Sequence, residues 1–440
     1  MIRRVLGRVG RIVLVLVAVL ALPAAVAGLD TRAAFGSWYT PPGPAPAVLP
    51  APPVHDPAKR TAVVVASMQG ATVPDALAPY EALAATGAFN VYLVAPERRP
   101  VPLTGGLDVL PDLDFAQLDA RLGGAAPDVV VMPAVPDSGT PSSRPLEEWA
   151  AQQMARHTLM ISVCNGAGVL ASAGLLDGRR ATAHWTRIDA YDEAYPAVDW
   201  QRGVRWVDDG DLISTAGILS GIDGTLHAID RLLGPAAAAQ AADALDWTPR
   251  PVAQEQHTWR PSDAIVVLNA GYRWDPPLIG VLLSDGVGET EAAAIFDTYG
   301  SQVLATRTIA LGSEPGAVVR SRHGLVFLPR AVVGEVAVDR LLAPAGSVAT
   351  AVGAELVPAP GTDPFDAVLR DIAVHVDVPT ARWVARAMEY PDTDLQLDGP
   401  GWPIGLILRP ILLGLVGLGL LVAVVSALRA RQRSRAKVDA

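Results

Sequence analysis

The stretch ISVCNGAGVLASAG at residues 161–174 decides the fold, because it joins a strand pattern to a helix pattern through the only cysteine of the chain. The apolar residues before Cys164 are typical of a strand buried on both faces of a sheet. The residues after Gly168 favour a helix, and the intervening glycines allow a tight turn. A nucleophile at such a turn is presented above the edge of a sheet. We therefore predict a nucleophile elbow at Cys164.

The elbow also predicts the state of the thiol. The new helix points its N-terminus at Cys164, and free N–H groups and the helix dipole favour a thiolate. The sequence thus predicts a thiol pKa below the ~8.5 of free cysteine. The backbone amides of Asn165 and Gly166 are expected to hold developing negative charge. The alternative is an inert cysteine in an apolar core, where free cysteines are common.

Three further Val-rich runs precede the elbow, at residues 61–67, 90–95 and 128–134. Helical patterns at residues 75–86 and 145–157 alternate with them. Such alternation predicts an α/β domain, with a flavodoxin-like doubly wound sheet, over residues 58–248.

The block ISVCNGAGVLASAGLLDGRRATAHW at residues 161–185 resembles the elbow region of the ThiJ/PfpI superfamily, which has a class I glutamine amidotransferase-like fold. Residues 68–83 resemble the first loop and helix of the family, and residues 214–234 resemble its last strand and helix. In motif, the chain is most similar to the isonitrile-hydratase-like and AraC-regulator-associated branch. Asn165 stands where protease-like members have His, and no His-x-Glu ending follows His184, so neither protease nor amidotransferase activity is favoured.

The resemblance implies two partners for Cys164. In the family a carboxylate lies five positions after a glycine and four before a proline, and Gly70, Asp75 and Pro79 keep this spacing. Asp75 is therefore the candidate acid or base, since a carboxyl beside a thiolate is pushed towards its protonated form. His184 stands where relatives often keep a histidine near the cysteine, to stabilise the thiolate or shuttle a proton. The alternatives are that Asp75 simply begins a helix and that His184 is a structural histidine bonded to backbone.

A second lobe is predicted at residues 262–395, as a degenerate ThiJ/PfpI-like repeat. Residues 279–300 echo the start of the first lobe, and Gly286 and Glu291 repeat the glycine-plus-five spacing. Residues 324–330 echo residues 128–134, but no cysteine follows, so Glu291 is expected to lack a catalytic partner.

Residues 365–391 favour a closing helical region. The related regulators carry a helix-turn-helix domain in this part of the chain. The stretch at residues 365–389 resembles such a motif superficially, but it lacks the basic face that DNA binding needs.

Two uncharged apolar runs, at residues 12–29 and 411–428, each approach the ~20 residues that cross a bilayer core. We predict an N-terminal transmembrane helix or signal anchor at residues 1–29, a C-terminal transmembrane helix at residues 402–428 and a basic cytoplasmic tail at residues 429–440. Arginines outside both runs place both termini in the cytoplasm and the residues between them outside the cell membrane. The alternatives are a cleaved signal peptide and, for the second run, a buried core helix.

A proline-rich segment fills the second half of residues 30–57, with the sequence PPGPAPAVLPAPPVHDP at residues 41–57. So many prolines predict a stiff polyproline II spacer. Trp38 and Tyr39, directly before it, are expected at the headgroup level of the membrane.

Composition excludes several classes. Half of the 440 residues are hydrophobic, which supports a sizeable core. The net charge of −10 includes +4 from the first eleven residues and +4 from the last twelve, which leaves −18 between them to repel nucleic acid. One cysteine excludes an internal disulfide and a Cys-rich zinc site. No P-loop, dinucleotide fingerprint or HExxH motif is present, so neither a cofactor nor a metal is predicted.

These observations predict a membrane-embedded, extracytoplasmic cysteine hydratase or hydrolase acting on a small electrophilic molecule. Cys164 would attack an electrophilic carbon, Asp75 would donate a proton, and water would release the product. The alternative is a non-catalytic envelope sensor or scaffold that binds a ligand or registers oxidation in the same pocket. A homodimer is left open as a further partner.

Overall fold

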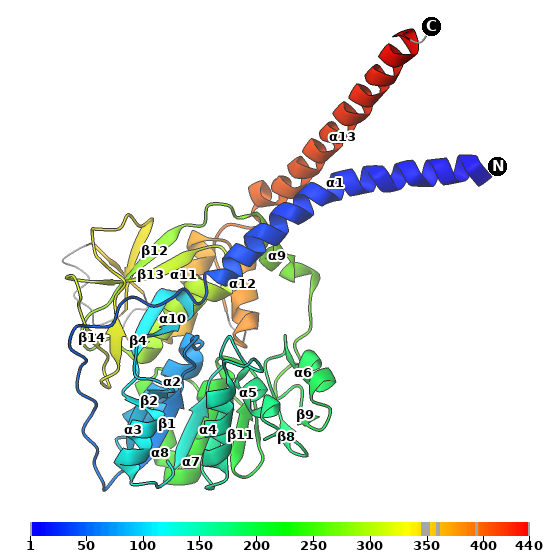
Figure 1. Ribbon diagram of the computed structural model, residues 1–440. Helices are drawn as coiled ribbons and strands as arrows, with labels where there is room; N and C mark the ends of the chain where they lie inside the picture. Colours follow the sequence, from blue (N-terminus) through cyan, green and yellow to red (C-terminus); the bar gives the residue numbers. More distant parts are fainter. Residues whose placement is uncertain (1, 345–352, 358–360, 392–394, 439–440) are drawn as a thin grey trace.

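The computed structural model describes residues 2–344, 353–357, 361–391 and 395–438. The last two residues of the predicted basic tail, and short stretches of the predicted second lobe, lie outside these ranges. The body of the molecule holds two sheets with their helices, and two long terminal helices leave it close together (Figure 1). Below, the first lobe means residues 58–248 and the second lobe means residues 262–395.

The first lobe is built on a seven-stranded mixed sheet in the order β10-β11-β7-β6-β1-β2-β5. Its strands are β1 (Arg60–Val65), β2 (Phe89–Ala95), β5 (Leu113–Asp114), β6 (Val129–Met132), β7 (Leu159–Val163), β10 (Trp206–Asp208) and β11 (Leu212–Thr215). The edge strand β10 is antiparallel to β11, whereas the other neighbours are parallel. The four strands predicted from Val-rich runs are all present, and the predicted α/β class is confirmed.

Helices cover both faces of this sheet (Figure 1). One face carries α2 (Val73–Ala85), α7 (Ser220–Leu233) and α8 (Pro235–Ala244), and the other carries α3 (Phe115–Leu122), α4 (Arg144–Met154) and α5 (Gly166–Ser172). Alternate residues of β1 show why the runs are apolar throughout. Ala62 and Val64 enter the core under α2, while Val63 and Val65 enter the core under α4. Each strand is therefore buried on both sides. Small elements complete the lobe, namely β8 (Arg180–Ala181), α6 (Ile188–Ala194) and β9 (Asp199–Trp200).

The second lobe has a five-stranded sheet in the order β16-β13-β12-β17-β18. Its strands are β12 (Leu278–Leu282), β13 (Arg307–Gly312), β16 (Ala331–Val332), β17 (Arg340–Ala343) and β18 (Glu355–Leu356). Its helices are α9 (Ala264–Tyr272), α10 (Glu289–Asp297), α11 (Pro364–His375) and α12 (Val378–Ala387). The strand and helix at the start of residues 279–300, and the helices of residues 365–391, lie where the sequence predicts them.

A third sheet joins the lobes. Its order is β14-β15-β4-β3, with β3 (Val101–Leu103) and β4 (Leu107–Leu110) from the first lobe and β14 (Val319–Arg320) and β15 (Val326–Leu328) from the second. The predicted echo of residues 128–134 in residues 324–330 is therefore wrong. β15 pairs with β4 of the other lobe, whereas β6 is central in its own sheet. A short apolar run fits either position, and only the tertiary pairing separates them.

Helices α2 and α10 pack against each other beside this joining sheet (Figure 1). The backbones of the two lobes lie close together at Gly105, which has a φ of 77°. A Cβ atom there would lie 2.1 Å from the carbonyl oxygen of Phe296, so only glycine fits. The lobes thus share one continuous core.

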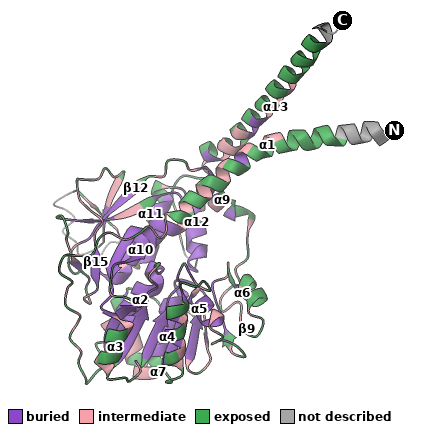
Figure 2. Cartoon of the chain, in the orientation of Figure 1, coloured by how far each residue is buried: buried purple, intermediate pink, exposed green. Residues whose placement is uncertain are grey.

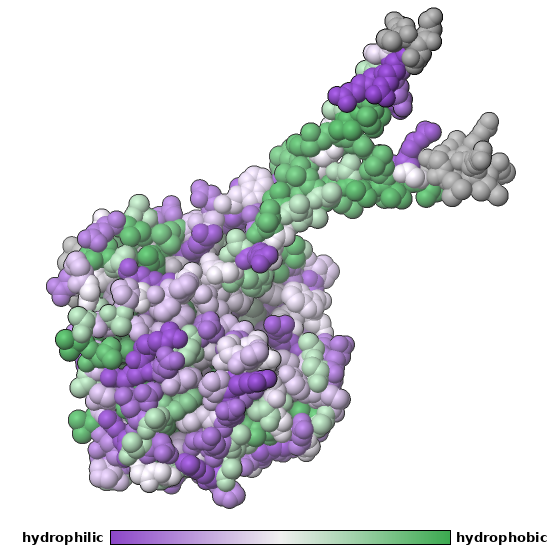
Figure 3. All heavy atoms as spheres, in the orientation of Figure 1, coloured by the Kyte–Doolittle hydropathy of each residue, from purple (hydrophilic) through white to green (hydrophobic). Residues whose placement is uncertain are grey.

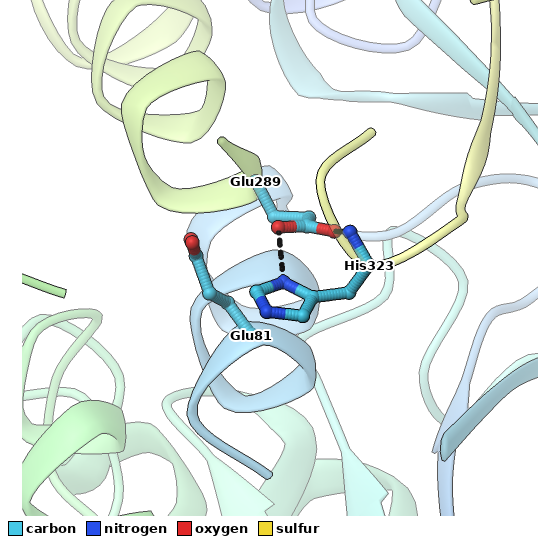
Figure 4. Close-up of side chains that lie close together, drawn as sticks. All are labelled: Glu81, Glu289 and His323. Atoms are coloured by element: carbon cyan, nitrogen blue, oxygen red, sulfur yellow. Dashed lines mark hydrogen bonds and ion pairs between the residues drawn. The ribbon is translucent and has the colours of Figure 1, made fainter. Parts of the chain in front are cut away.

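Buried charges also cross this contact (Figure 4). Glu81 of α2 accepts a hydrogen bond from the backbone N–H of Thr290 at 2.7 Å and pairs with Arg322 at 2.9 Å. Glu289 of α10 pairs with Nδ1 of His323 at 3.0 Å. Burial raises the pKa of Glu81 to about 7, and the charge of Glu289 adds to the shift. The lobe contact is therefore sensitive to pH near neutrality.

We expect Glu81→Gln to remove much of the pH dependence of stability between about pH 4.5 and pH 7. Because the pKa of folded Glu81 is raised, its protonation stabilises the fold fully below its ordinary pKa, and this stabilisation is lost as pH rises through about 7. The change is of the order of 3 kcal/mol at most. Thermal unfolding in detergent across this pH range measures it, with exposed Glu97→Gln as the control. Parallel curves for wild type and Glu81→Gln would contradict the assignment.

The terminal helices are α1 (Ile2–Gly36) and α13 (Ile404–Val438). Their stretches Val9–Gly36 and Ile404–Arg435 are long and apolar enough to cross a membrane. Both are largely exposed along their length (Figure 2). They meet where a Cβ atom on Gly417 would lie 2.0 Å from the carbonyl oxygen of Ala18, a close approach that small residues permit. α1 continues to Gly36 rather than ending near residue 29.

The proline-rich segment at residues 41–57 contains no helix or strand and lies along the first lobe. Side chains of the lobe hold its backbone. Arg121 donates to the carbonyl oxygen of Pro53 at 2.6 Å, and Asn90 accepts from the backbone N–H of Asp56 at 2.9 Å. The segment is therefore hydrogen-bonded to the surface of the first lobe, whereas the sequence predicts a stiff spacer that stands free of it.

Candidate functional site

The predicted strand-to-helix turn is present at Cys164. β7 ends at Val163, Cys164 has a φ of 56°, and α5 begins at Gly166. A positive φ is uncommon for a residue with a side chain and is a form of strain found at functional turns. A Cβ atom on Gly166 would lie 2.1 Å from the carbonyl oxygen of Met132, so glycine alone lets α5 approach the end of β6. This packing fixes the position of the sulfur.

Asp75 lies in the first turn of α2 and is fully buried. Its Oδ2 accepts a hydrogen bond from the backbone N–H of Ala134 at 3.1 Å. Its Oδ1 has no hydrogen-bond partner among the described residues. Burial raises the pKa of Asp75 well above its usual range, and the charge of Asp297 raises it further. Burial therefore favours the neutral acid form of Asp75, and its Oδ1 is free to exchange a proton.

The predicted low pKa of Cys164 is wrong. The side chain is 4% exposed, and burial raises the pKa of the thiol well above its ordinary value. The negative charge of Asp75 raises it too, whereas a hydrogen bond from the backbone of Asn165 lowers it. The seven-residue helix α5 is short, and its dipole with one N–H donor does not offset the cost of a buried charge. Burial therefore favours the protonated form of both Cys164 and Asp75.

His184 lies on the loop after β8, with both ring nitrogens engaged. Its Nε2 lies 2.7 Å from the carbonyl oxygen of Ala387, which can only accept, so Nε2 carries the proton. Its Nδ1 then accepts from the hydroxyl of Thr186 at 2.7 Å. Burial lowers the pKa of His184, which keeps the ring neutral. These bonds fit the structural alternative and tie the loop to the end of α12.

Tyr39 and Thr72 form part of the site, although sequence reasoning missed them. The hydroxyl of Tyr39 lies 3.1 Å from Oγ1 of Thr72, at the start of α2. A Cβ atom on Gly70 would lie 2.5 Å from the Tyr39 ring, so this glycine makes room for it. Burial raises the pKa of Tyr39, and the charges of Asp75 and Cys164 add to the shift. Tyr39 therefore contacts the first loop of the lobe, and its place relative to the lipid headgroups stays a prediction.

No pattern in the sequence predicts that Tyr39 contacts Thr72. It lies far upstream of the elbow, and an aromatic pair after an apolar helix is also what a membrane boundary would show.

A cavity of about 640 Å³ opens at Cys164. The first lobe contributes Cys164, Asn165 and His184, among others. The remaining walls come from α1, α9, α12 and nearby loops, through Thr31, Phe35, Trp38, Val266, Val267 and Trp383, among others. A volume of this size suits a drug-sized ligand. The candidate site is thus formed by both lobes and by the end of α1.

Glu291 does not line this cavity. It pairs with Arg322 at 2.8 Å on the outside of the lobe contact. Among the described residues, two groups hold three side chains able to bind a metal, namely Glu81 with Glu289 and His323, and Glu355 with Asp371 and His375. In the first group the oxygens of Glu81 are already occupied by Thr290 and Arg322, so its hydrogen bonds are met without an ion.

Alkylation of Cys164 by iodoacetamide at pH 7 is expected to be at least about tenfold slower in the folded protein than in the unfolded chain, because the raised pKa leaves little thiolate. The alkylation rate of free cysteine stops rising once the pH exceeds its pKa of ~8.5. The rate for folded Cys164 should continue to rise above that pH, because its pKa is higher. Mass spectrometry of the intact chain measures this directly, since it holds one cysteine. A folded protein that reacts faster than free cysteine at pH 6 would contradict the raised pKa.

The chain is similar to several known proteins. The profile of the DJ-1/PfpI family matches residues 59–230. An isonitrile hydratase from Pseudomonas putida is 34% identical over 184 residues, which cover 40% of this chain and 74% of that protein. The HTH-type transcriptional regulator CdhR from Pseudomonas aeruginosa is 38% identical over 98 residues, which cover 22% of this chain and 29% of the regulator.

Among solved structures, a ThiJ/PfpI family protein from Pseudomonas syringae is 25% identical, with a TM-score of 0.39 over 47% of this chain and 84% of that one. The family profile match includes β1, α2 and the elbow. Together with the isonitrile hydratase, which is 34% identical and is matched over 74% of its length, this profile match shows that the chain belongs to the DJ-1/PfpI family.

Proposed function

We propose that this chain is a membrane-anchored, extracytoplasmic hydratase that uses Cys164 to add water to an isonitrile or a similar small electrophile. The observation that carries the proposal is an elbow thiol that lines a cavity, together with the buried acid Asp75, which is close enough for its charge to raise the pKa of that thiol. The similarity to a protein named isonitrile hydratase supports this substrate class. Cys164, Asp75 and the amides of Asn165 and Gly166 are the proposed site residues, with His184 beside them.

In the first proposed step, the sulfur of Cys164 forms a bond to the terminal carbon of R–N≡C. Asp75 gives its proton to that same carbon, and the thiol proton passes to Asp75 and restores the acid. The product is a thioimidate, R–N=CH–S–Cys164. Because both groups begin and end neutral, this route avoids separated charge in a dry cavity, where charge separation is costly. The raised pKa values of both groups are then suited to the reaction.

In the second step, the oxygen of a water molecule bonds to the thioimidate carbon, and one water proton goes to nitrogen. The carbon–sulfur bond then breaks, and the other water proton returns to Cys164. The product is the formamide R–NH–CHO. Backbone N–H groups at Asn165 and Gly166 would stabilise developing negative charge at the elbow. His184 acts in this proposal as a positioning residue, because both of its nitrogens are engaged.

The second lobe is proposed to be a degenerate repeat of the first. Each lobe has a strand followed by a helix at the contact, β1 with α2 and β12 with α10, and these helices pack against each other. The second lobe carries no cysteine and instead supplies one wall of the cavity, through residues such as Leu304 and Trp383. Its role would be to exclude water from the thiol.

Membrane anchoring is proposed from the two apolar helices and their basic flanks, with both termini in the cytoplasm. Reporter fusions at Ala440 and within residues 41–57 test this arrangement. We expect a cytoplasmic signal from the first and an extracytoplasmic signal from the second. An extracytoplasmic signal at Ala440 would exclude two membrane crossings.

The enzymatic proposal is tested by incubating the full-length protein in lipid nanodiscs with a panel of isonitriles and measuring formamide production. Wild type should turn over at least one member, and Cys164→Ser should not. A panel that yields no formamide and leaves the thiol unmodified would reject the hydratase.

The second candidate function is a ligand-binding sensor or scaffold, and the high pKa of the buried thiol favours it over a freely reactive nucleophile. Ligand binding that protects Cys164 from alkylation, in the absence of turnover, would support this function instead.

A further inference from the structure

One wall of the Cys164 cavity is the end of α1. Thr31, Phe35 and Trp38 all line the cavity. Thr31 and Phe35 are four residues apart and share one face of α1, and Trp38 follows in the turn directly after the helix. The proposed membrane anchor is therefore part of the pocket, and a ligand at Cys164 lies beside it.

The opposite lip of the cavity is α9, which contributes Val266, Val267 and Ala270. α9 is held against the apolar part of α1. A Cβ atom on Gly271 would lie 3.0 Å from Cβ of Ala27, and the hydroxyl of Tyr272 donates to the carbonyl oxygen of Pro23 at 3.3 Å.

Both contacts with α9 fall within the uncharged run at residues 12–29. At 1.5 Å per residue, Phe35 lies only about 12 Å along the helix from Ala27. The polar zone of a bilayer is about 5–8 Å thick on each side. In a membrane, the lip of the cavity would therefore lie at or just above the headgroups.

The mouth of the cavity is apolar. Of the side chains that line it, Phe35 is 46% exposed, Val267 is 60% exposed and Trp259 is 63% exposed. Arg187 is the one Asp, Glu, Lys or Arg side chain that lines it in the described part of the chain. Figure 3 shows apolar surface along the terminal helices down to the place where they join the body.

Further exposed aromatic side chains lie on the segments next to the terminal helices, including Trp274 and Trp402. Arg409 of α13 stacks on Trp274 at 4.7 Å from the ring centre. Amphipathic rings of this kind favour the membrane–water boundary.

We infer that the substrate reaches Cys164 from the membrane, as a small amphiphile with an electrophilic carbon at its head and an apolar alkyl or aryl tail. The head would lie at Cys164, and the tail would lie between α1 and α9. This inference rests on the proposed anchoring, and on the proposed function for the chemistry of the head. Exposed apolar side chains at the mouth of a cavity are unfavourable in water and are stabilised by contact with lipid.

Labelling of Cys164 tests this entry route without requiring turnover. The full-length protein in phosphatidylcholine vesicles is treated with octyl-iodoacetamide or with iodoacetamide, and the labelled fraction is followed by intact mass. The ratio of the two rates is compared with the same ratio for unfolded protein in detergent. We expect the octyl reagent to be favoured at least about tenfold in vesicles. Equal rates for the two reagents would overturn the inference, even if isonitriles are hydrated.

Val267→Glu provides the matched variant, because it places a charge on the lip. It should lower the rate with the octyl reagent at least about tenfold, whereas Val267→Leu should keep it. Leu356→Glu, at an exposed position on β18 outside the cavity, is the control and should keep the wild-type rates. Melting temperatures show that each variant is folded. The route would be overturned if Leu356→Glu lost labelling by the octyl reagent. It would also be overturned if Val267→Glu kept the wild-type labelling rate. If labelling follows the expected pattern but no isonitrile is hydrated, entry from the membrane stands and the hydratase fails.

Discussion

Asp75→Asn is expected to lower kcat for isonitrile hydration by about a hundredfold or more, the usual contribution of a positioned acid. The amide can still accept from the backbone N–H of Ala134, so the packing around α2 should persist. It has no proton to give to the substrate carbon and cannot take one from the thiol. Turnover therefore fails at the bond-forming step, although the ligand still binds.

The same substitution should leave the thiol at least as reactive towards iodoacetamide. Ionised Asp75 would raise the pKa of Cys164, and an amide cannot carry that charge, so the substitution does not suppress the thiolate. The measurement is kcat and the alkylation rate on the same preparations. Asp112→Asn is the matched control, since Asp112 is also buried with a pKa raised by burial to about 7, yet its carboxylate accepts from the backbone N–H of Leu93 and does not lie beside Cys164. Wild-type kcat in Asp75→Asn would remove the acid from the mechanism.

The first-lobe sheet could be predicted because its strands are buried on both faces. Such strands are apolar at every position, and the runs at β1, β6 and β7 stand out from the helices between them. The elbow was also visible, because the sequence has one cysteine and it follows a strand directly. These features depend on neighbours in the chain.

The joining sheet could not be predicted in the same way. β3 and β4 are three and four residues long and are separated by the turn Thr104–Gly106. Their stability comes from β15, more than two hundred residues later, which pairs Phe327 with Val109. A short apolar run forms a strand here because of that pairing, and the pairing cannot be predicted from the residues next to it in the chain.

The protonation states of the site could not be predicted from the sequence either. The motif gave Cys164 and Asp75, and standard helix electrostatics predicted a thiolate. Whether a thiol ionises depends on how much water surrounds it, and that is set by α1, α9 and α12 closing over the elbow. Tyr39 was missed for the same reason, because its place beside Thr72 depends on the path of the chain after α1.

Asp223→Ala is expected to destabilise the fold by about 3–5 kcal/mol, because it leaves a guanidinium buried without its partner. Oδ2 of Asp223 on α7 lies 2.6 Å from Nε of Arg205, and the two side chains are only 2% and 4% exposed. Oδ1 accepts from Nε1 of Trp247 at 2.9 Å and from the backbone N–H of Arg250 at 3.0 Å. Arg205 also donates to the carbonyl oxygen of Glu389 at 3.0 Å, so the pair holds the end of α12 on the first lobe.

Chemical unfolding in detergent measures the loss, with Arg202→Ala as the control. Arg202 pairs with Asp189, whose side chain is 86% exposed, and such a surface pair contributes at most about 1 kcal/mol. The double variant Arg205→Met/Asp223→Leu decides the physical cause. If the cost comes from an unpaired buried charge, the double variant should be more stable than Asp223→Ala, since neither charge remains. If the cost comes instead from the lost bonds to Trp247, Arg250 and Glu389, the double variant should be at least as unstable as Asp223→Ala.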